Sequence, residues 1–175
     1  ISTINKIRFD PTNPCEDDID IRDIAHALSM MTRANGHFTE FYSVARHSVN
    51  CALEATARGY SKRVALFCLL HDSAESYIGD MTRPLKMHFP LFSEYEKKLQ
   101  KVIFSKYATL DIAEDEKEKV KSVDDSLLYH EFLCYHGDNL FDFTPEIHID
   151  VKDNSKNISE TEKEFLCMYE ALKIK

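Results

Sequence analysis

The chain has 175 residues, of which 43% are hydrophobic and 30% are charged, and its formal net charge is −8 at pH 7. This length and balance predict a single domain over residues 1–175 with a buried core. The acidic charge disfavours binding to a nucleic acid polymer. Because the sequence has neither a long apolar run nor a signal-peptide pattern, we expect a cytoplasmic protein with no membrane association.

Helix is expected to dominate the fold, because only four glycines and five prolines interrupt the chain and no long apolar/polar alternation occurs. The pattern predicts an all-α bundle of about six helices. The cysteines have no CxxC spacing, so we interpret them as free thiols in a reducing compartment: Cys15, Cys51, Cys68, Cys134 and Cys167.

The first helix is predicted to follow an irregular segment, residues 1–19, in which residues 6–9 can form a short strand. Asp20 is a suitable N-cap for this helix. The apolar residues that follow Asp20, as far as Met31, share one helical face.

A turn and a second helix come next. Asn35-Gly36 is a turn signal, and Arg33 lies beside it, either as an exposed loop residue or as part of a site. The second helix is predicted over residues 43–58, where His47 falls on the core-facing side. A histidine in that position is either a hydrogen-bonded core residue or a metal ligand.

The segment that follows organises the rest of the sequence. Val64 to Leu70 form an unbroken apolar run, which indicates burial, and a helix is predicted over residues 61–78. At the end of the run His71, Asp72 and Glu75 project from one end of this core helix. They form either a solvated helix end or part of a metal site.

More charge follows around Pro84, which indicates either a loop or a new helix start, and Asp80, Arg83 and Lys86 lie close together there in the sequence. These side chains are either solvated loop charges or the lining of a site for a phosphate-bearing ligand.

The last part of the chain predicts three more helices, over residues 93–107, 113–135 and 159–172. The first and third of these open on apparent capping boxes, Ser93 to Glu96 and Ser159 to Glu162. Between the second and third, residues 136–157 are polar and can hold a short strand at 147–151.

Asp124 lies inside the apolar stripe of the 113–135 helix, so it should point inward, where a carboxylate is costly unless it is paired or metal-bound. Asp125 is the alternative ligand at this position. With His47, His71 and Asp72, Asp124 completes a set of two imidazoles and two carboxylates, which suits one divalent metal ion.

This H…HD…D pattern resembles the HD-domain phosphohydrolase superfamily, a helical-bundle family. A second match, to the bacterial and phage 5′-deoxynucleotidase branch, is carried by His71-Asp72-Ser73-Ala74-Glu75, Gly79-Asp80, Pro84 and Lys86. Upstream, residues 23–29, Arg33, Gly36-His37 and residues 41–48 resemble the same branch, so that the resemblance covers about residues 7–130.

The resemblance implies one divalent metal (Mn, Co, Mg, Zn or Fe), a small nucleotide substrate and a homodimer. The implied ligands are His47, His71, Asp72 and Asp124; the implied catalytic residues are Glu75 and Asp80; the implied substrate-binding residues are Arg33, Lys86 and Arg83. The expected reaction is hydrolysis of a (deoxy)nucleoside 5′-monophosphate to nucleoside and phosphate. The alternatives are a deoxynucleoside triphosphate hydrolase on the same fold and a non-catalytic nucleotide-binding module.

Overall fold

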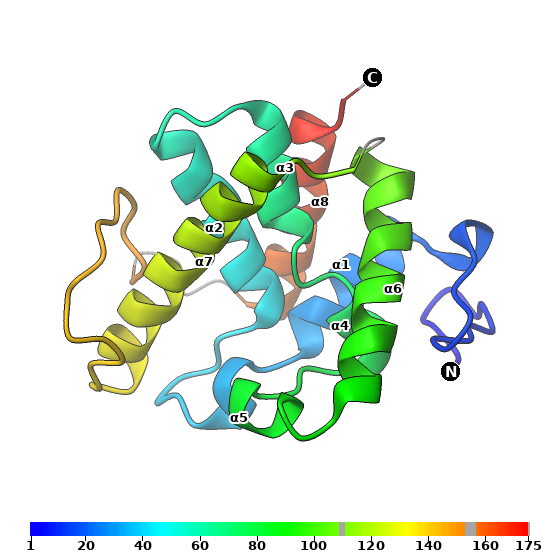
Figure 1. Ribbon diagram of the computed structural model, residues 1–175, viewed down its shortest axis with the longest axis horizontal. Coiled ribbons are helices and arrows are strands. Elements are labelled where there is room, and N and C mark those ends of the chain that lie inside the picture. The colour runs from blue at the N-terminus through cyan, green and yellow to red at the C-terminus, as the bar shows by residue number, and fades with distance from the viewer. Residues whose placement is uncertain (109–110, 153–156, 175) are drawn as a thin grey trace.

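The computed structural model describes residues 1–108, 111–152 and 157–174, and it is a bundle of helices (Figure 1). Within these ranges no strand forms, and the only β-pairing is two isolated bridges, Ser2 with Arg8 and Thr32 with Ser43. The prediction of an all-α fold is confirmed.

The chain forms longer helices and short elements of three or four residues. The longer helices are α1 (Ile21–Met30), α2 (Val44–Ala57), α3 (Lys62–Leu70), α6 (Pro90–Ala108), α7 (Glu114–Tyr135) and α8 (Ile158–Leu172). The short elements are η1 (Glu16–Asp18), η2 (Arg33–Gly36), α4 (Glu75–Ile78) and α5 (Arg83–Lys86).

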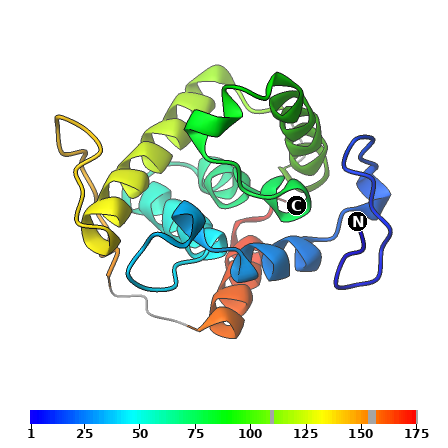
Figure 2. The same ribbon diagram turned by 90° about the horizontal axis from the view of Figure 1, so that it is seen from below.

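The core is centred on α2 and α3, which pack against each other and against both α7 and α8. Every side chain from Val64 to Leu70 is buried, so α3 is covered on all sides, as its unbroken apolar run predicts. Helix α6 covers α3 from another side. In the view from below, α5 lies between α6 and α7 (Figure 2).

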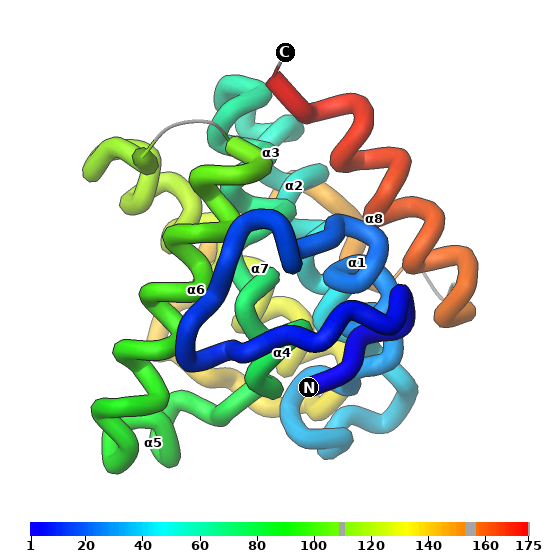
Figure 3. The backbone as a smooth tube through the Cα atoms, turned by 90° about the vertical axis from the view of Figure 1, so that its right-hand side faces the viewer, coloured from blue at the N-terminus to red at the C-terminus, as the bar shows by residue number. Residues whose placement is uncertain are grey.

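The N-terminal segment crosses the face formed by α1, α4 and α6 (Figure 3). Phe9 packs on the ring of Tyr77 in α4, and Lys106 in α6 donates to the carbonyls of Glu16 and Ile19. Residues 6–9 do not form a strand: the bridge at Arg8 stays isolated, and Lys6 has a positive φ of 63°.

Helices α1, α2 and α3 begin at the capping residues that the sequence predicts. The side chains of Asp20, Ser43 and Ser61 accept backbone N–H bonds at the starts of α1, α2 and α3. The capping boxes expected at Ser93 and Ser159 are wrong. Helix α6 begins three residues earlier, at Pro90, since proline is well suited to a first helical position. Helix α8 is capped by Asn157, which exchanges hydrogen bonds with Glu160.

The expected strand at 147–151 is also wrong. The polar backbone groups of this region bond to side chains of α2 and α7 instead of to a neighbouring strand. His148 N donates to Glu54, Arg58 donates to Glu146 O, and Tyr135 donates to Val151 O.

The cysteines are free thiols, as predicted, and Cys51 and Cys68 are buried. None of the helices in the described residues is both long and apolar enough to cross a membrane.

Candidate metal centre

Four side chains, from α2, from α7 and from the turn after α3, converge at the end of α3. His47 Nε2 on α2 lies 3.3 Å from His71 Nε2, 3.2 Å from an Asp124 oxygen on α7 and 3.8 Å from an Asp72 oxygen. His71 Nε2 lies 3.3 Å from Asp72 and 3.7 Å from Asp124. We call His47, His71, Asp72 and Asp124 the His–Asp cluster.

The His–Asp cluster depends on a break in the helix that was predicted over residues 61–78. That helix is not continuous: α3 ends at Leu70, a turn follows, and α4 starts at Glu75. The Gln100 side chain of α6 accepts from Ala74 N at 3.0 Å and donates to Leu70 O at 2.6 Å. In a continuous helix the N–H of Ala74 would donate to the carbonyl of Leu70. Here Gln100 bonds to both groups instead, and a side chain inserted in this way is a known cause of a helix break.

The ring nitrogens that face away from the cluster are held by hydrogen bonds. His71 Nδ1 lies 2.7 Å from Cys68 O, and His47 Nδ1 lies 2.7 Å from a Glu131 oxygen. Since a carbonyl or carboxylate can only accept, each Nδ1 carries the proton and donates it. When its ring is neutral, each Nε2 then presents a lone pair to the cluster, as a metal ligand must.

Charge within the cluster favours a cation. Burial raises the pKa of Asp124, but hydrogen bonds and charge from His47 and His71 outweigh it and hold that pKa well below its usual range. Burial and Arg33 oppose a charge on His47, yet Glu131 and Asp124 help to raise its pKa well above the usual value. The carboxylates that stabilise a proton on the imidazoles would also stabilise a divalent metal there.

Arg33 reaches the cluster from a strained turn. Ala34 and Asn35, both with φ of 51°, and Gly36, with φ of 78°, adopt left-handed conformations in succession. The Arg33 guanidinium lies 3.4 Å from Asp72 and 3.5 Å from Glu131, with only 12% of the side chain exposed. Arg33 therefore bridges a cluster carboxylate and the carboxylate behind His47.

Glu75 lies beside the cluster and is almost fully buried. Its Oε2 has no hydrogen-bond partner among the described residues. Burial, together with the negative charges of Asp72 and Asp80, raises the pKa of Glu75 to about 10. Burial also raises the pKa of Asp80. Burial and neighbouring negative charge therefore favour the protonated form of Glu75 beside the His–Asp cluster.

The other basic residues lie further out. Lys86 pairs with Glu96 at 2.6 Å, and its positive charge acts on Glu75 and Asp80. Arg83 is exposed and 4.0 Å from Asp125, which also pairs with Lys121. The structure therefore brings Asp124 into the cluster and places Asp125 with surface cations, and Arg83 remains at the rim.

A cavity of about 770 Å³ opens between α6 and α7 and reaches the cluster at His71 and Asp124. We call it the lysine groove. Its other lining residues are four lysines, three apolar side chains and two polar ones: Lys97, Lys101, Lys117, Lys121, Phe104, Ile112, Val120, Gln100 and Asp111. The groove thus combines an apolar wall with cations beside the cluster.

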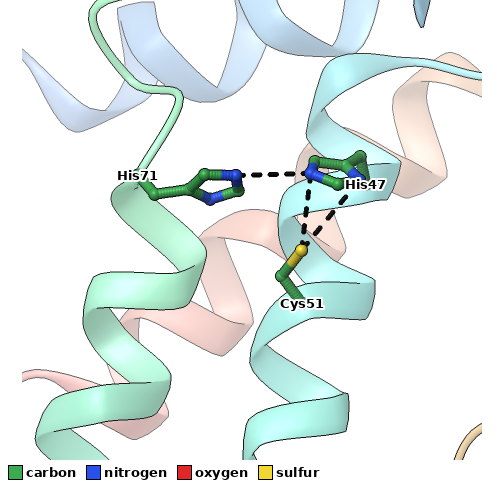
Figure 4. A group of neighbouring side chains, drawn as sticks. All are labelled: His47, Cys51 and His71. Carbon is green, nitrogen blue, oxygen red and sulfur yellow. Dashed lines mark hydrogen bonds between the residues drawn. The ribbon is translucent and has the colours of Figure 1, made fainter. Parts of the chain in front are cut away.

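Sequence reasoning missed two residues at this centre. Glu131 is fully buried and follows Asp124 by seven residues, two helical turns on the same face, so an acidic residue in that apolar stripe was the available signal. Cys51 follows His47 by one turn and was interpreted only as a core thiol. His47, Cys51 and His71 offer ligand atoms within 4.8 Å of one another (Figure 4). Burial raises the pKa of the Cys51 thiol to about 11.

Fold and site together describe an all-α bundle with a partly buried group of imidazoles, carboxylates and a thiol that can hold a metal ion. No family model matches the chain.

Curated relatives match about half of the chain. The uncharacterized protein YfdR of Escherichia coli is 40% identical over 92 residues, 53% of this chain and 49% of that protein. An uncharacterized protein of Rhodobacter capsulatus is 44% identical over 84 residues, 45% of this chain and 42% of that protein. The 5′-deoxynucleotidase yfbR of Photorhabdus temperata is 30% identical over 95 residues, 48% of each.

The chain spans about half the length of the curated relatives it matches. About half of this chain is therefore similar to a protein named as a 5′-deoxynucleotidase, while the other two relatives carry no named activity.

Proposed function

We propose that the chain is a metal-dependent phosphohydrolase of the HD-domain superfamily that converts (deoxy)nucleoside 5′-monophosphates to nucleoside and phosphate. One observation carries the proposal: the His71 imidazole and the Asp72 and Asp124 carboxylates lie within 3.8 Å of His47 Nε2, and the cluster lies beside a buried acid, Glu75. The partial similarity to a 5′-deoxynucleotidase supports the same class of reaction.

The donor set fits one divalent ion, with the His–Asp cluster as the proposed ligands. When bound, such an ion supplies Lewis acidity to a phosphoryl oxygen and lowers the pKa of an attacking water. Two nitrogens and two oxygens suit Mn, Co, Zn or Fe better than Mg, which prefers an all-oxygen shell.

Glu75 is the proposed general acid. Because burial and two neighbouring carboxylates raise its pKa to about 10, it holds a proton at neutral pH. That proton would pass to the ribose O5′ as the bond from O5′ to phosphorus breaks and a water oxygen bonds to phosphorus. Asp80, on the same side of the cluster, is proposed to share this proton transfer or to bind a sugar hydroxyl.

Arg33 and Lys86 are the proposed phosphate partners. Arg33 is held next to Asp72, where its guanidinium can meet two phosphoryl oxygens at once. Lys86 on α5 is proposed to release its ion pair with Glu96 and to pair with the substrate phosphate instead, which adds a second positive charge there. Arg83, exposed at the rim, is the proposed outermost contact.

The lysine groove favours a second candidate function, hydrolysis of deoxynucleoside triphosphates. Four lysines line the groove, and Lys97 and Lys101 form no ion pair with another described residue. A polyphosphate chain in the groove would meet more positive charge than one phosphate requires.

The test is product analysis with metal-stripped protein to which Mn, Co, Mg or Zn is added singly. Deoxy- and ribonucleoside mono- and triphosphates are supplied as substrates, and inorganic phosphate and triphosphate are measured separately. We expect inorganic phosphate from deoxynucleoside monophosphates. Release of triphosphate would favour the second candidate, and a metal-loaded protein that hydrolyses nothing would favour a nucleotide-binding module.

A further inference from the structure

Cys51 lies next to the ring nitrogen of His47 that faces the His–Asp cluster. The two residues are one turn apart on α2, and Cys51 Sγ is 3.4 Å from His47 Nε2 and 4.0 Å from Nδ1 (Figure 4). The sulfur is thus closer to the nitrogen that faces the His–Asp cluster than to the one that Glu131 holds. Cys51 is 1% exposed, so this contact is shielded from solvent.

The distance between Cys51 Sγ and His47 Nε2 is the one expected when both atoms bind the same metal ion. With a metal–nitrogen bond of about 2.0–2.1 Å and a metal–sulfur bond of about 2.3 Å, the two ligand atoms lie about 3.1–3.6 Å apart at right or tetrahedral angles. The separation of 3.4 Å between Cys51 Sγ and His47 Nε2 falls within that range. His71 Nε2, at 3.3 Å from His47 Nε2, lies at a spacing expected for two nitrogens on the same ion.

We propose that Cys51 is a sulfur ligand of the ion held by the His–Asp cluster, and that it makes the site select zinc or cobalt over magnesium and manganese. The inference rests on the metal site of the proposed function and not on the reaction. Thiolate is a soft ligand that favours zinc and disfavours magnesium, calcium and manganese. When the metal–sulfur bond forms, the thiol proton leaves to solvent, and nothing is oxidised or reduced.

The direct test needs no variant. The full chain is stripped of metal, loaded with one equivalent of Zn²⁺, and its zinc-edge X-ray absorption is recorded. We expect a sulfur neighbour at about 2.3 Å in addition to nitrogen and oxygen neighbours at about 2.0–2.1 Å. A bound zinc ion with nitrogen and oxygen neighbours alone would overturn the proposal.

A variant pair extends the test. Cobalt-loaded wild-type protein should show a sulfur-to-cobalt charge-transfer band in the near ultraviolet, which Cys51→Ser should lose. Cys68→Ser, which removes another buried thiol outside the cluster, should keep the band. The preference for Zn²⁺ over Mg²⁺ should fall at least about tenfold in Cys51→Ser, as expected when a metal site loses a supporting group.

Circular dichroism of the metal-free proteins shows whether the variants fold, and Cys51→Ala provides a second substitution. An unchanged band or an unchanged metal preference in a folded Cys51 variant would refute a ligand role. Phosphate release is measured on the same samples, so the two proposals fail separately. A sulfur neighbour without hydrolysis contradicts only the function, and hydrolysis without a sulfur neighbour contradicts only the role of Cys51.

Discussion

The two ends of α2 each place polar side chains against α7, but charge is balanced at only one end. Near the C-terminal end, buried Glu54 accepts from Arg58 Nε at 2.7 Å, from His148 N at 2.8 Å and from His148 Nδ1 at 2.9 Å. Burial alone would raise the pKa of Glu54, but these donors lower it. This carboxylate is fully paired within the chain.

Near the N-terminal end, His47 faces a concentration of acids. The pKa of Glu75 rises to about 10 because burial and neighbouring negative charges are not offset by Arg33 and Lys86. Opposite pKa shifts on two buried glutamates, Glu54 and Glu75, are typical of a balanced structural cluster and of a candidate site respectively. The first stabilises the fold, and the second creates a negative field suited to a cation and a held proton suited to transfer.

The largest expected effect comes from breaking the His–Asp cluster. Asp124→Ala should abolish metal binding and reduce phosphate release by more than about ten-thousandfold, because Lewis acidity and water activation are lost together. Metal content and phosphate release measure the effect. Asp125→Ala is the matched control, because Asp125 pairs with Lys121 and Arg83 outside the cluster; if Asp125→Ala loses the metal instead, the ligand assignment is wrong.

The next effect separates metal binding from proton transfer. Glu75→Gln should retain metal and lose about a hundred- to ten-thousandfold in kcat, the usual contribution of a general acid. Single-turnover kinetics and metal content measure the two properties. Exposed Glu94→Gln on α6 serves as the control, and a fully active Glu75→Gln would remove Glu75 from the reaction.

A smaller effect is expected from the carboxylate behind His47. Glu131→Gln should weaken metal binding about ten- to hundredfold, because a neutral amide orients the His47 ring less strongly. Titration with a competing chelator measures the affinity. Tyr42→Phe removes the hydroxyl that donates to Glu131 at 2.9 Å but leaves the Glu131–His47 bond, so its effect should be smaller. Equal losses in both variants would contradict a specific role for the bond to His47.

The smallest effect concerns the balanced end of α2. Glu54→Gln should lower the free energy of unfolding by about 2 kcal/mol at pH 7, since charge-assisted hydrogen bonds to Arg58 and His148 are lost. Folding lowers the pKa of Glu54 below its ordinary 4.5. The ionised carboxylate therefore stabilises the fold fully above pH 4.5, and this stabilisation is lost as the pH falls through the pKa that Glu54 has in the folded protein. Denaturant unfolding at pH 7 and at acid pH measures it; a difference from wild type that persists at acid pH would contradict this account.

Much of the helical fold could be predicted, because the apolar periodicities and the caps at Asp20, Ser43 and Ser61 are local signals. The inward orientation of His47 and Asp124 followed from the same helical wheels. That these side chains bind a metal is still a prediction.

The features that could not be predicted are those made by distant partners. The break after Leu70 contains no glycine or proline and depends on Gln100, thirty residues further along the chain. The contact of Arg33 with Glu131 spans 98 residues. The strand expected at 147–151 does not form because side chains of α2 and α7 compete for its backbone groups.

The Gln100 bridge also bears on the order of folding. In the turn after Leu70, the Ala74 N–H and the Leu70 carbonyl both bond to the Gln100 side chain of α6, so the final geometry of this turn is reached only when α6 docks on α3. Helices α2 and α3 are joined by a short connection and can pair early. We expect substitutions at Gln100 to act mainly on the unfolding rate, as interactions formed after the transition state do. The turn that carries His71 and Asp72 would then be completed after α3 itself.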